Sequence, residues 1–278
     1  MAEKHFIDTA VGRLKVTTLG TGAPAVLWHS LFVDERSWDR VAPDLARDRR
    51  LILITGPGHG ESSDPHRRYD LPQCARAAEE VLDELGVAGP VDWVGNAWGG
   101  HVGVIVATAP AHRVRSLVTI GTPVQALGVA ERVRTRSLLL LHRLLGPAGF
   151  IADAVVETLL SAATCTNDPV AVALVRSSFV EADPVRLRRA VVSISVHRES
   201  LAELLPGLRV PTLMVTGEQH SGWTPTQAAA AIRAVPDGRT AVVPDAAYLV
   251  PLEQPDAVVA LVRDFWASAL AQEPGSQR

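Results

Sequence analysis

A glycine-rich segment is the first place where this sequence could support chemistry. Residues 95–100 read Gly-Asn-Ala-Trp-Gly-Gly and follow the apolar run 91–94. Small residues at this spacing permit a sharp turn between a strand and a helix, which projects one side chain. That side chain belongs to Ala97, and a methyl group has no lone pair with which to attack a substrate. The segment therefore predicts a turn suited to a nucleophile, with alanine at the nucleophile's position.

The elements around this turn alternate between apolar strands and amphipathic helices. The expected strands are 5–8 and 13–19, which form a hairpin, then 25–29, 50–54, 91–94, 116–120, 212–216 and 240–243. The expected helices are 37–46, 70–84 with Asp70 as its cap and Gly86 after its end, 99–109, and two that begin near Thr224 and Gln254. This alternation predicts a mostly parallel sheet with helices on both faces.

The alternation stops between residues 125 and 206. Helical spacing without a convincing strand covers 130–145, 151–160, 169–179 and 184–197. We therefore expect a core domain of residues 1–124 and 207–278 with a helical cap at 125–206. A cap over the carboxyl ends of the strands would exclude water from a ligand bound there. A helical appendage without a gating role is the alternative.

Five segments, in order, resemble the motifs of the α/β-hydrolase family. They are the oxyanion loop (29–32), the GxGxS-like turn (56–62), the nucleophile elbow (95–100), the strand before the acid (210–217) and the histidine segment (244–255). The resemblance covers nearly the whole chain and implies an α/β fold with a mostly parallel eight-stranded sheet and a cap. The Trp98 elbow is most similar to those of haloalkane dehalogenases and epoxide hydrolases, or of serine enzymes with SWGG.

The triad of that family does not carry over to this chain. The nucleophile position is Ala97, His220 stands where an acid is expected, and Tyr248 stands where a histidine is expected. Thr55 replaces the usual aspartate after the second parallel strand. The resemblance thus implies a site in which no residue fills the family's nucleophile, base or acid role.

Two parts of the catalytic machinery are expected to remain. The backbone N–H groups of Leu31 and Trp98 would form an oxyanion hole, and one such donor is worth about 3 kcal/mol in a dry site. The resemblance also brings His220 and Tyr248 together, so that an imidazole could hydrogen-bond a phenol pointing toward Ala97 and act as an acid/base pair. The alternatives are a decayed triad with Tyr248 filling space, and a shifted loop that misplaces His220.

Four further residues could contact a ligand. They are His29 and Ser30 in the oxyanion loop, Asn96 in the elbow, and Thr55. The Trp98 indole could also donate to a ligand, although packing in the core is an equal alternative. Serines such as Ser30 commonly bond only to backbone groups, and Asn96 could simply tolerate a strained turn.

The composition excludes several classes of protein. The chain has 278 residues, 47% of them hydrophobic, and a net charge of −3, so neither nucleic acid nor a membrane is an expected partner. Cys74 and Cys165 show no ligand spacing and no CxxC pattern, and with no signal-peptide pattern at the N-terminus they suggest a cytoplasmic protein. We expect no metal and no cofactor and a small apolar ligand, and a homodimer is compatible with the sequence.

These observations leave three functions open. The first is a non-hydrolytic enzyme, either an isomerase, epimerase, lyase or cyclase, since some triad-less relatives of the fold act so in natural-product pathways. The second is a pseudo-hydrolase that binds a ligand or partner without turnover. The third is a conventional hydrolase with an engineered change of its nucleophile to Ala97, against which the residues at 220 and 248 argue.

Overall fold

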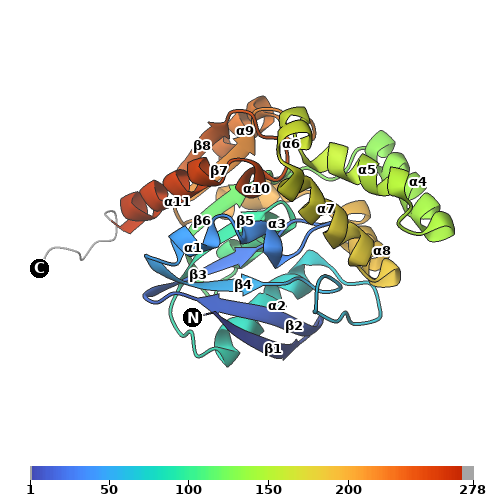
Figure 1. Ribbon diagram of the computed structural model, residues 1–278. Helices are drawn as coiled ribbons and strands as arrows, with labels where there is room; N and C mark the ends of the chain where they lie inside the picture. The colour runs from blue at the N-terminus through green and yellow to red at the C-terminus, as the bar shows by residue number, and fades with distance from the viewer. Residues whose placement is uncertain (1, 271–278) are drawn as a thin grey trace, which may run out of the picture.

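The computed structural model describes residues 2–270, in which eight strands form one sheet (Figure 1). The strands are β1 (Glu3–Thr9), β2 (Gly12–Leu19), β3 (Ala23–Trp28), β4 (Arg49–Ile54), β5 (Val91–Asn96), β6 (Val114–Ile120), β7 (Thr212–Gly217) and β8 (Gly238–Val243). Their order is β1-β2-β4-β3-β5-β6-β7-β8. Strand β2 pairs antiparallel with β1 and β4, and all other pairs are parallel. The predicted mostly parallel, eight-stranded sheet is confirmed.

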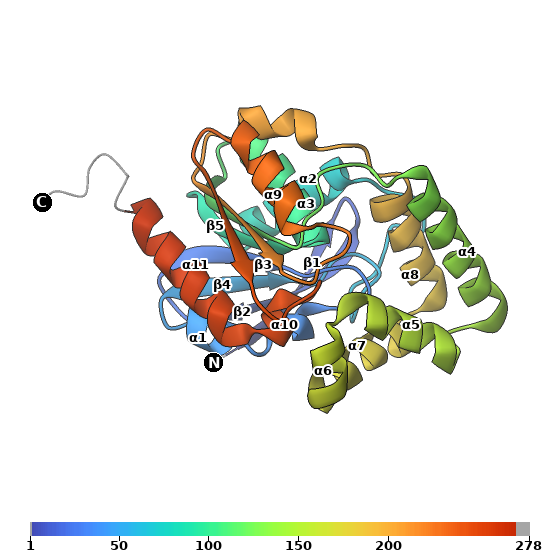
Figure 2. The same ribbon diagram turned by 90° about the horizontal axis from the view of Figure 1, so that it is seen from above.

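Helices cover both faces of the sheet (Figure 2). One face carries α2 (Leu71–Glu84), α3 (Trp98–Thr108) and α9 (Pro225–Ala231), and the other carries α1 (Ala42–Leu45) and α11 (Pro255–Leu270), with α10 (Val250–Glu253) just before α11. Side chains alternate along each strand. In β3, Val26 and Trp28 therefore join the core beneath α2 and α3, whereas Ala25 and Leu27 join the core beneath α1 and α11.

Local signals set most of the element boundaries. Asp70 caps α2 through the backbone N–H of Gln73, and the Gln73 side chain bonds back to Asp70, which forms a capping box. The single helix predicted over 37–46 is wrong. The chain instead forms a 3₁₀ helix, η1 (Glu35–Trp38), followed by α1, because Pro43 suits the first turn of a new helix rather than the interior of a long one.

Between β6 and β7 the chain is helical. It forms α4 (Val129–Leu145), α5 (Gly149–Leu159), α6 (Ala162–Asn167), α7 (Pro169–Glu181), α8 (Pro184–Val191), the π-helix η2 (Val192–Val196) and the 3₁₀ helix η3 (Ala202–Gly207). The sequence did not predict α6. We call α4 to η2 the helical insertion. Helices α5, α7 and α8 pack with Val33, Leu249 and Leu252 of the core in one apolar cluster.

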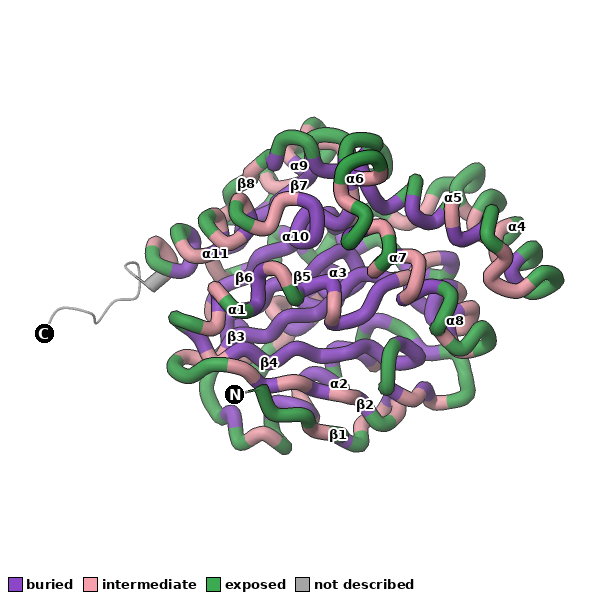
Figure 3. Tube along the Cα trace, viewed as in Figure 1, coloured by how far each residue is buried: buried purple, intermediate pink, exposed green. Residues whose placement is uncertain are grey.

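The sheet and the helical insertion differ in how far their residues are buried. The inner strands β3 to β7 are largely buried, whereas α4 is mostly exposed (Figure 3). Within residues 2–270, no helix combines the length and the apolar character that a membrane crossing requires. In the same range, no group of three or more acidic, histidine or cysteine side chains is arranged to hold a metal ion.

Candidate active site

The turn from β5 to α3 has the geometry of a nucleophile elbow. Ala97 adopts φ +46° and ψ −97°, a conformation that costs a non-glycine residue about 1–3 kcal/mol. Its N–H donates to the Ile120 carbonyl over 2.8 Å. A Cβ on Gly99 would lie 1.9 Å from the Trp28 carbonyl oxygen, and one on Gly95 would lie 2.1 Å from Gly99. Close packing therefore imposes this turn, and it places a methyl group at its apex.

The two predicted oxyanion donors lie on one cavity. Leu31 and Trp98 both line a cavity of about 220 Å³ that is enclosed by loops of the sheet and by the helical insertion. Within residues 2–270, no hydrogen bond joins either backbone N–H to an acceptor. Phe32, just after Leu31, has φ +69°, which turns the loop sharply at this point. The structure thus places both residues on the same cavity, each with a backbone N–H that has no acceptor within residues 2–270.

His220 and Tyr248 line this cavity and are in contact. Their ring centroids are 4.6 Å apart with the planes inclined by 39°. His220 Nδ1, however, accepts hydrogen bonds from the N–H groups of Gly222 and Trp223 at 3.1 and 3.0 Å. The proton of the neutral ring must then lie on Nε2. The predicted hydrogen bond between imidazole and phenol is not formed within the described part of the chain, because the loop occupies the accepting nitrogen.

Burial disfavours the charged form of both rings. It lowers the pKa of His220 to about 4, so the ring is neutral near pH 7. Burial also raises the pKa of the Tyr248 phenol. Contact with Ser30 and the charge of Arg198 both act to lower this pKa, but they offset the effect of burial only in part. Ser30 is fully buried, and its Oγ makes no hydrogen bond of good geometry within residues 2–270. Ser30 therefore lies beside the phenol rather than being tied to the backbone.

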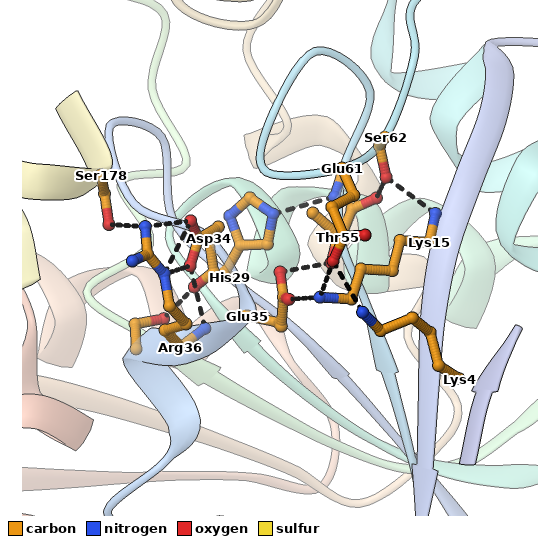
Figure 4. Close-up of polar contacts among 12 residues, drawn as sticks. Lys4, Lys15, His29, Asp34, Glu35, Arg36, Thr55, Glu61, Ser62 and Ser178 are labelled. Atoms are coloured by element: carbon orange, nitrogen blue, oxygen red, sulfur yellow. Dashed lines mark hydrogen bonds and ion pairs between the residues drawn. The ribbon is translucent and has the colours of Figure 1, made fainter. Parts of the chain in front are cut away.

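Thr55, predicted as a ligand contact, belongs to a polar network with Glu35, Lys15 and Glu61 (Figure 4). Its hydroxyl donates to a Glu35 oxygen at 2.5 Å, and Glu35 forms an ion pair with Lys15. Lys15 also pairs with Glu61 at 2.9 Å. The Thr55 hydroxyl is therefore committed to Glu35, and Thr55 is not among the residues that line the cavity of Leu31 and Trp98, so its contact with a ligand stays a prediction.

His29 and Asn96 hold backbone segments in place. His29 Nδ1 donates to the Ser30 carbonyl at 2.7 Å, and its Nε2 accepts from the Gly56 N–H at 2.8 Å. Asn96 donates to the carbonyls of Ile120 and Tyr248 at 3.0 and 3.3 Å. Both ring nitrogens of His29 and the amide nitrogen of Asn96 are therefore committed to backbone groups, and a ligand contact by either residue stays a prediction.

The Trp98 indole lies in the core. It packs edge-on against Trp28 and His29 and also contacts His59, at centroid distances of 5.2–5.6 Å. A Cβ on Gly56 would lie 2.3 Å from the far edge of the indole. These contacts favour packing in the core, the alternative to a ligand contact. The indole Nε1 has no hydrogen-bond partner within residues 2–270, and its contact with a ligand stays a prediction.

Sequence reasoning missed two cavity residues, His101 and Arg198. His101 Nε2 donates to the Pro123 carbonyl at 2.8 Å, so Nδ1 carries the lone pair, and this atom has no partner within residues 2–270. Burial, with the charge of Arg198, holds the pKa of His101 well below its ordinary value. Its position four residues after Ala97, one helical turn along α3, was the only available signal.

Comparison with known proteins identifies the class. The chain belongs to the Alpha/beta hydrolase family, whose profile matches residues 25–261. It is similar to a thermophilic esterase from Thermogutta terrifontis (TM-score 0.89, 26% identity, 96% of this chain and 99% of that chain). It is also similar to the enol-lactonase from Burkholderia xenovorans LB400 (TM-score 0.84, 25% identity, 93% of this chain and 99% of that chain).

Curated relatives point the same way. Haloalkane dehalogenase 2 from Mycobacterium bovis is 26% identical over 278 residues, which cover 94% of this chain and 93% of the relative. Two other relatives align with the chain over only 27% and 39% of their own length. The family and these named relatives indicate an enzyme. The predicted non-hydrolytic function, as isomerase, epimerase, lyase or cyclase, is wrong, because relatives that include the haloalkane dehalogenase and the enol-lactonase are hydrolytic enzymes by name.

Proposed function

We propose that the protein is a hydrolase that binds a small ester or lactone in the cavity beside Leu31 and Trp98. The esterase and the enol-lactonase to which it is similar support this substrate class. The observation that carries the proposal is the strained elbow at Ala97, held with two available backbone N–H groups on one cavity. Such donors stabilise the oxyanion that forms when a carbonyl is attacked.

Water is the nucleophile in this proposal. Ala97, His220 and Tyr248 stand at the three triad positions, so no side chain there can form an acyl intermediate in the family's way. The water oxygen forms a bond to the carbonyl carbon while its proton passes to a base. The acyl C–O bond then breaks, and the base returns the proton to the leaving oxygen. Acid and alcohol are the products, or a hydroxy acid when the substrate is a lactone.

His101 is the imidazole suited to take that proton. Its Nδ1 lone pair is unpaired within residues 2–270, whereas His220 Nδ1 already accepts two backbone N–H groups. The depressed pKa of His101 keeps the ring neutral at neutral pH and makes Nδ1, which is itself buried, a weak base. Slow turnover is therefore expected.

The position of the cavity supports a cap. Ile194 and Ser195 of the helical insertion line it opposite Leu31 and Trp98. We retain residues 125–206 as a cap on a core of residues 1–124 and 207–278, which would exclude bulk water from the bound carbonyl. A small-molecule ligand and a homodimer remain predictions.

The test measures hydrolysis of p-nitrophenyl acetate and of a simple lactone, together with intact-protein mass. We expect slow turnover without a burst and without an acyl adduct. The variant His101→Gln, whose amide can still donate to the Pro123 carbonyl, should lose at least about tenfold in rate. The control His112→Gln removes an exposed imidazole and should leave the rate unchanged. A burst with a covalent acyl-protein would overturn the water mechanism.

A ligand-binding protein without turnover is the second candidate, and the methyl group of Ala97 is the observation that favours it. The same assay separates the two functions. Saturable binding of an ester with no product above the uncatalysed rate supports binding alone, and product formation supports the hydrolase.

A further inference from the structure

Arg198 is a buried cation on the cavity of the candidate active site. It follows η2, is 7% exposed, and lines the same cavity as Leu31, Trp98 and Tyr248. Its guanidinium donates to the backbone carbonyls of Gln125 and Glu199. A guanidinium has five N–H donors, so these two bonds leave others for a ligand.

No carboxylate lies within 4 Å of this guanidinium in the part of the chain that the structure describes. Another buried arginine, Arg49, is 8% exposed and pairs with Asp92 at 2.7 Å. The fold thus gives Arg49 a carboxylate in direct contact, whereas Arg198 has only the more distant negative charge of Glu131. Burial lowers the pKa of Arg198 to about 10, so the group is still charged at neutral pH. An unpaired buried charge is costly, and an anionic ligand would offset that cost.

We propose that Arg198 binds a carboxylate of the substrate, so that the substrate is a small carbonyl compound carrying a separate carboxylate. This inference rests on the proposed function, since it takes the bound molecule to be the substrate. The planar fork of a guanidinium matches the two oxygens of a carboxylate. The carboxylate would fix one end of the molecule while Leu31 and Trp98 hold the reacting carbonyl.

The other groups on the cavity favour a monoanion. Glu131 lines the same wall, and its negative charge disfavours a dianion such as phosphate. His101 is neutral because of its depressed pKa, and the Tyr248 phenol is neutral because burial raises its pKa. Arg198 therefore supplies the positive charge toward the ligand, and the negative charge of Glu131 makes a single carboxylate a better fit than a dianion.

The experiment compares binding of phenylacetate with binding of its neutral analogue phenylacetamide, by calorimetry without any turnover. We expect phenylacetate to bind at least about tenfold more tightly, the scale of a hydrogen bond to a charged group. Arg198→Gln should remove this preference while leaving phenylacetamide binding unchanged. Loss of both ligands together would instead indicate that Arg198 only clamps the Gln125 and Glu199 carbonyls, and would overturn the proposal.

Two matched variants locate the effect. Arg68→Gln removes an exposed arginine from a neighbouring cavity of about 810 Å³, which Arg198 also borders, and should leave the preference intact. Thr108→Phe fills that second cavity. If it abolishes phenylacetate binding, the carboxylate lies there and the proposal is wrong.

A third variant keeps the test possible if Arg198→Gln does not fold. In that case Arg198→Lys is measured instead, and a weakened but persistent preference for phenylacetate over phenylacetamide supports the proposal. Absence of any preference in the unmodified protein overturns it. Because every readout is binding, failure of this inference is distinct from failure of ester hydrolysis.

Discussion

The turn after β5 and the loops after β7 and β8 meet at one cavity, but they depend on the sequence in different ways. At the turn, the backbone provides the chemistry: Gly95 and Gly99 allow the chain to pass close to itself, and Trp98 lines the cavity with a backbone N–H that has no acceptor within residues 2–270. In the two loops, the chemistry of the family depends on side chains, and His220 and Tyr248 occupy those positions. A change of side chain therefore leaves the backbone chemistry of the turn in place, whereas it removes the side-chain chemistry of the two loops.

The geometry shows this contrast directly. Ala97 retains the strained backbone conformation although it has no functional group. His220 has a functional group, yet its accepting nitrogen is bound by the N–H groups of its own loop. Backbone-encoded parts of a site withstand substitution, whereas side-chain-encoded parts require several residues to be correct at once.

The largest expected effect comes from rebuilding the loops around the intact turn. The triple variant Ala97→Ser, His220→Asp and Tyr248→His restores a nucleophile, an acid and a base at the three triad positions. We expect its rate on p-nitrophenyl acetate to exceed that of the unmodified protein by at least about 10³-fold. Ala97→Ser alone should give no appreciable gain, because no base adjoins the new hydroxyl.

A fluorophosphonate probe provides an independent measurement. It should label the triple variant and not the single one, since labelling requires an activated hydroxyl. A large gain in esterase rate over the unmodified protein in Ala97→Ser alone would mean that the loops still supply a base, and the contrast between the two regions would fail.

The second-largest expected effect comes from a substitution within the turn after β5. Gly99→Ala places a Cβ against the Trp28 carbonyl, and we expect the free energy of unfolding to fall by about 3 kcal/mol, the scale of overpacking in a core. Denaturant unfolding measures this change. Gly89→Ala is the matched control, because a Cβ there meets nothing within 4 Å, and its effect should stay within about 0.5 kcal/mol. Equal effects at both glycines would show that packing does not impose the turn.

The smallest expected effect is on the pH dependence of the free energy of unfolding. Because the pKa of His220 is about 4 in the folded chain and 6.5 is the ordinary value, the unfolded chain binds a proton first as the pH falls. The resulting stability is present above about pH 6.5 and is lost as the pH falls toward 4. We therefore expect the free energy of unfolding to fall between pH 7 and pH 5.5. In His220→Gln this fall should be smaller by about 1 kcal/mol.

Denaturant unfolding at both pH values gives this difference. The exposed His112→Gln should leave the pH dependence as it is. An unchanged slope in His220→Gln would contradict the buried, neutral ring that the structure shows.

Much of the scaffold could be predicted because its signals are local. The apolar run 91–94 and the glycines after it required a strand and a tight turn, and Asp70 required the start of a helix. The broken helix over 37–46 and the network around Thr55 could not be predicted. The latter depends on Glu35, which lies 20 residues away in sequence, and spacing does not reveal such a contact.

The sequence by itself determined the order of strands and helices, the turn at residue 97 and the absence of a nucleophilic side chain there. Only the tertiary structure decided which polar groups remain available. It paired Nδ1 of His220 with its own loop, left Nδ1 of His101 unpaired, and buried Arg198 without a carboxylate. Hydrogen-bond and charge partners come from distant segments, so the reactivity of a side chain depends on packing that its type and spacing do not encode.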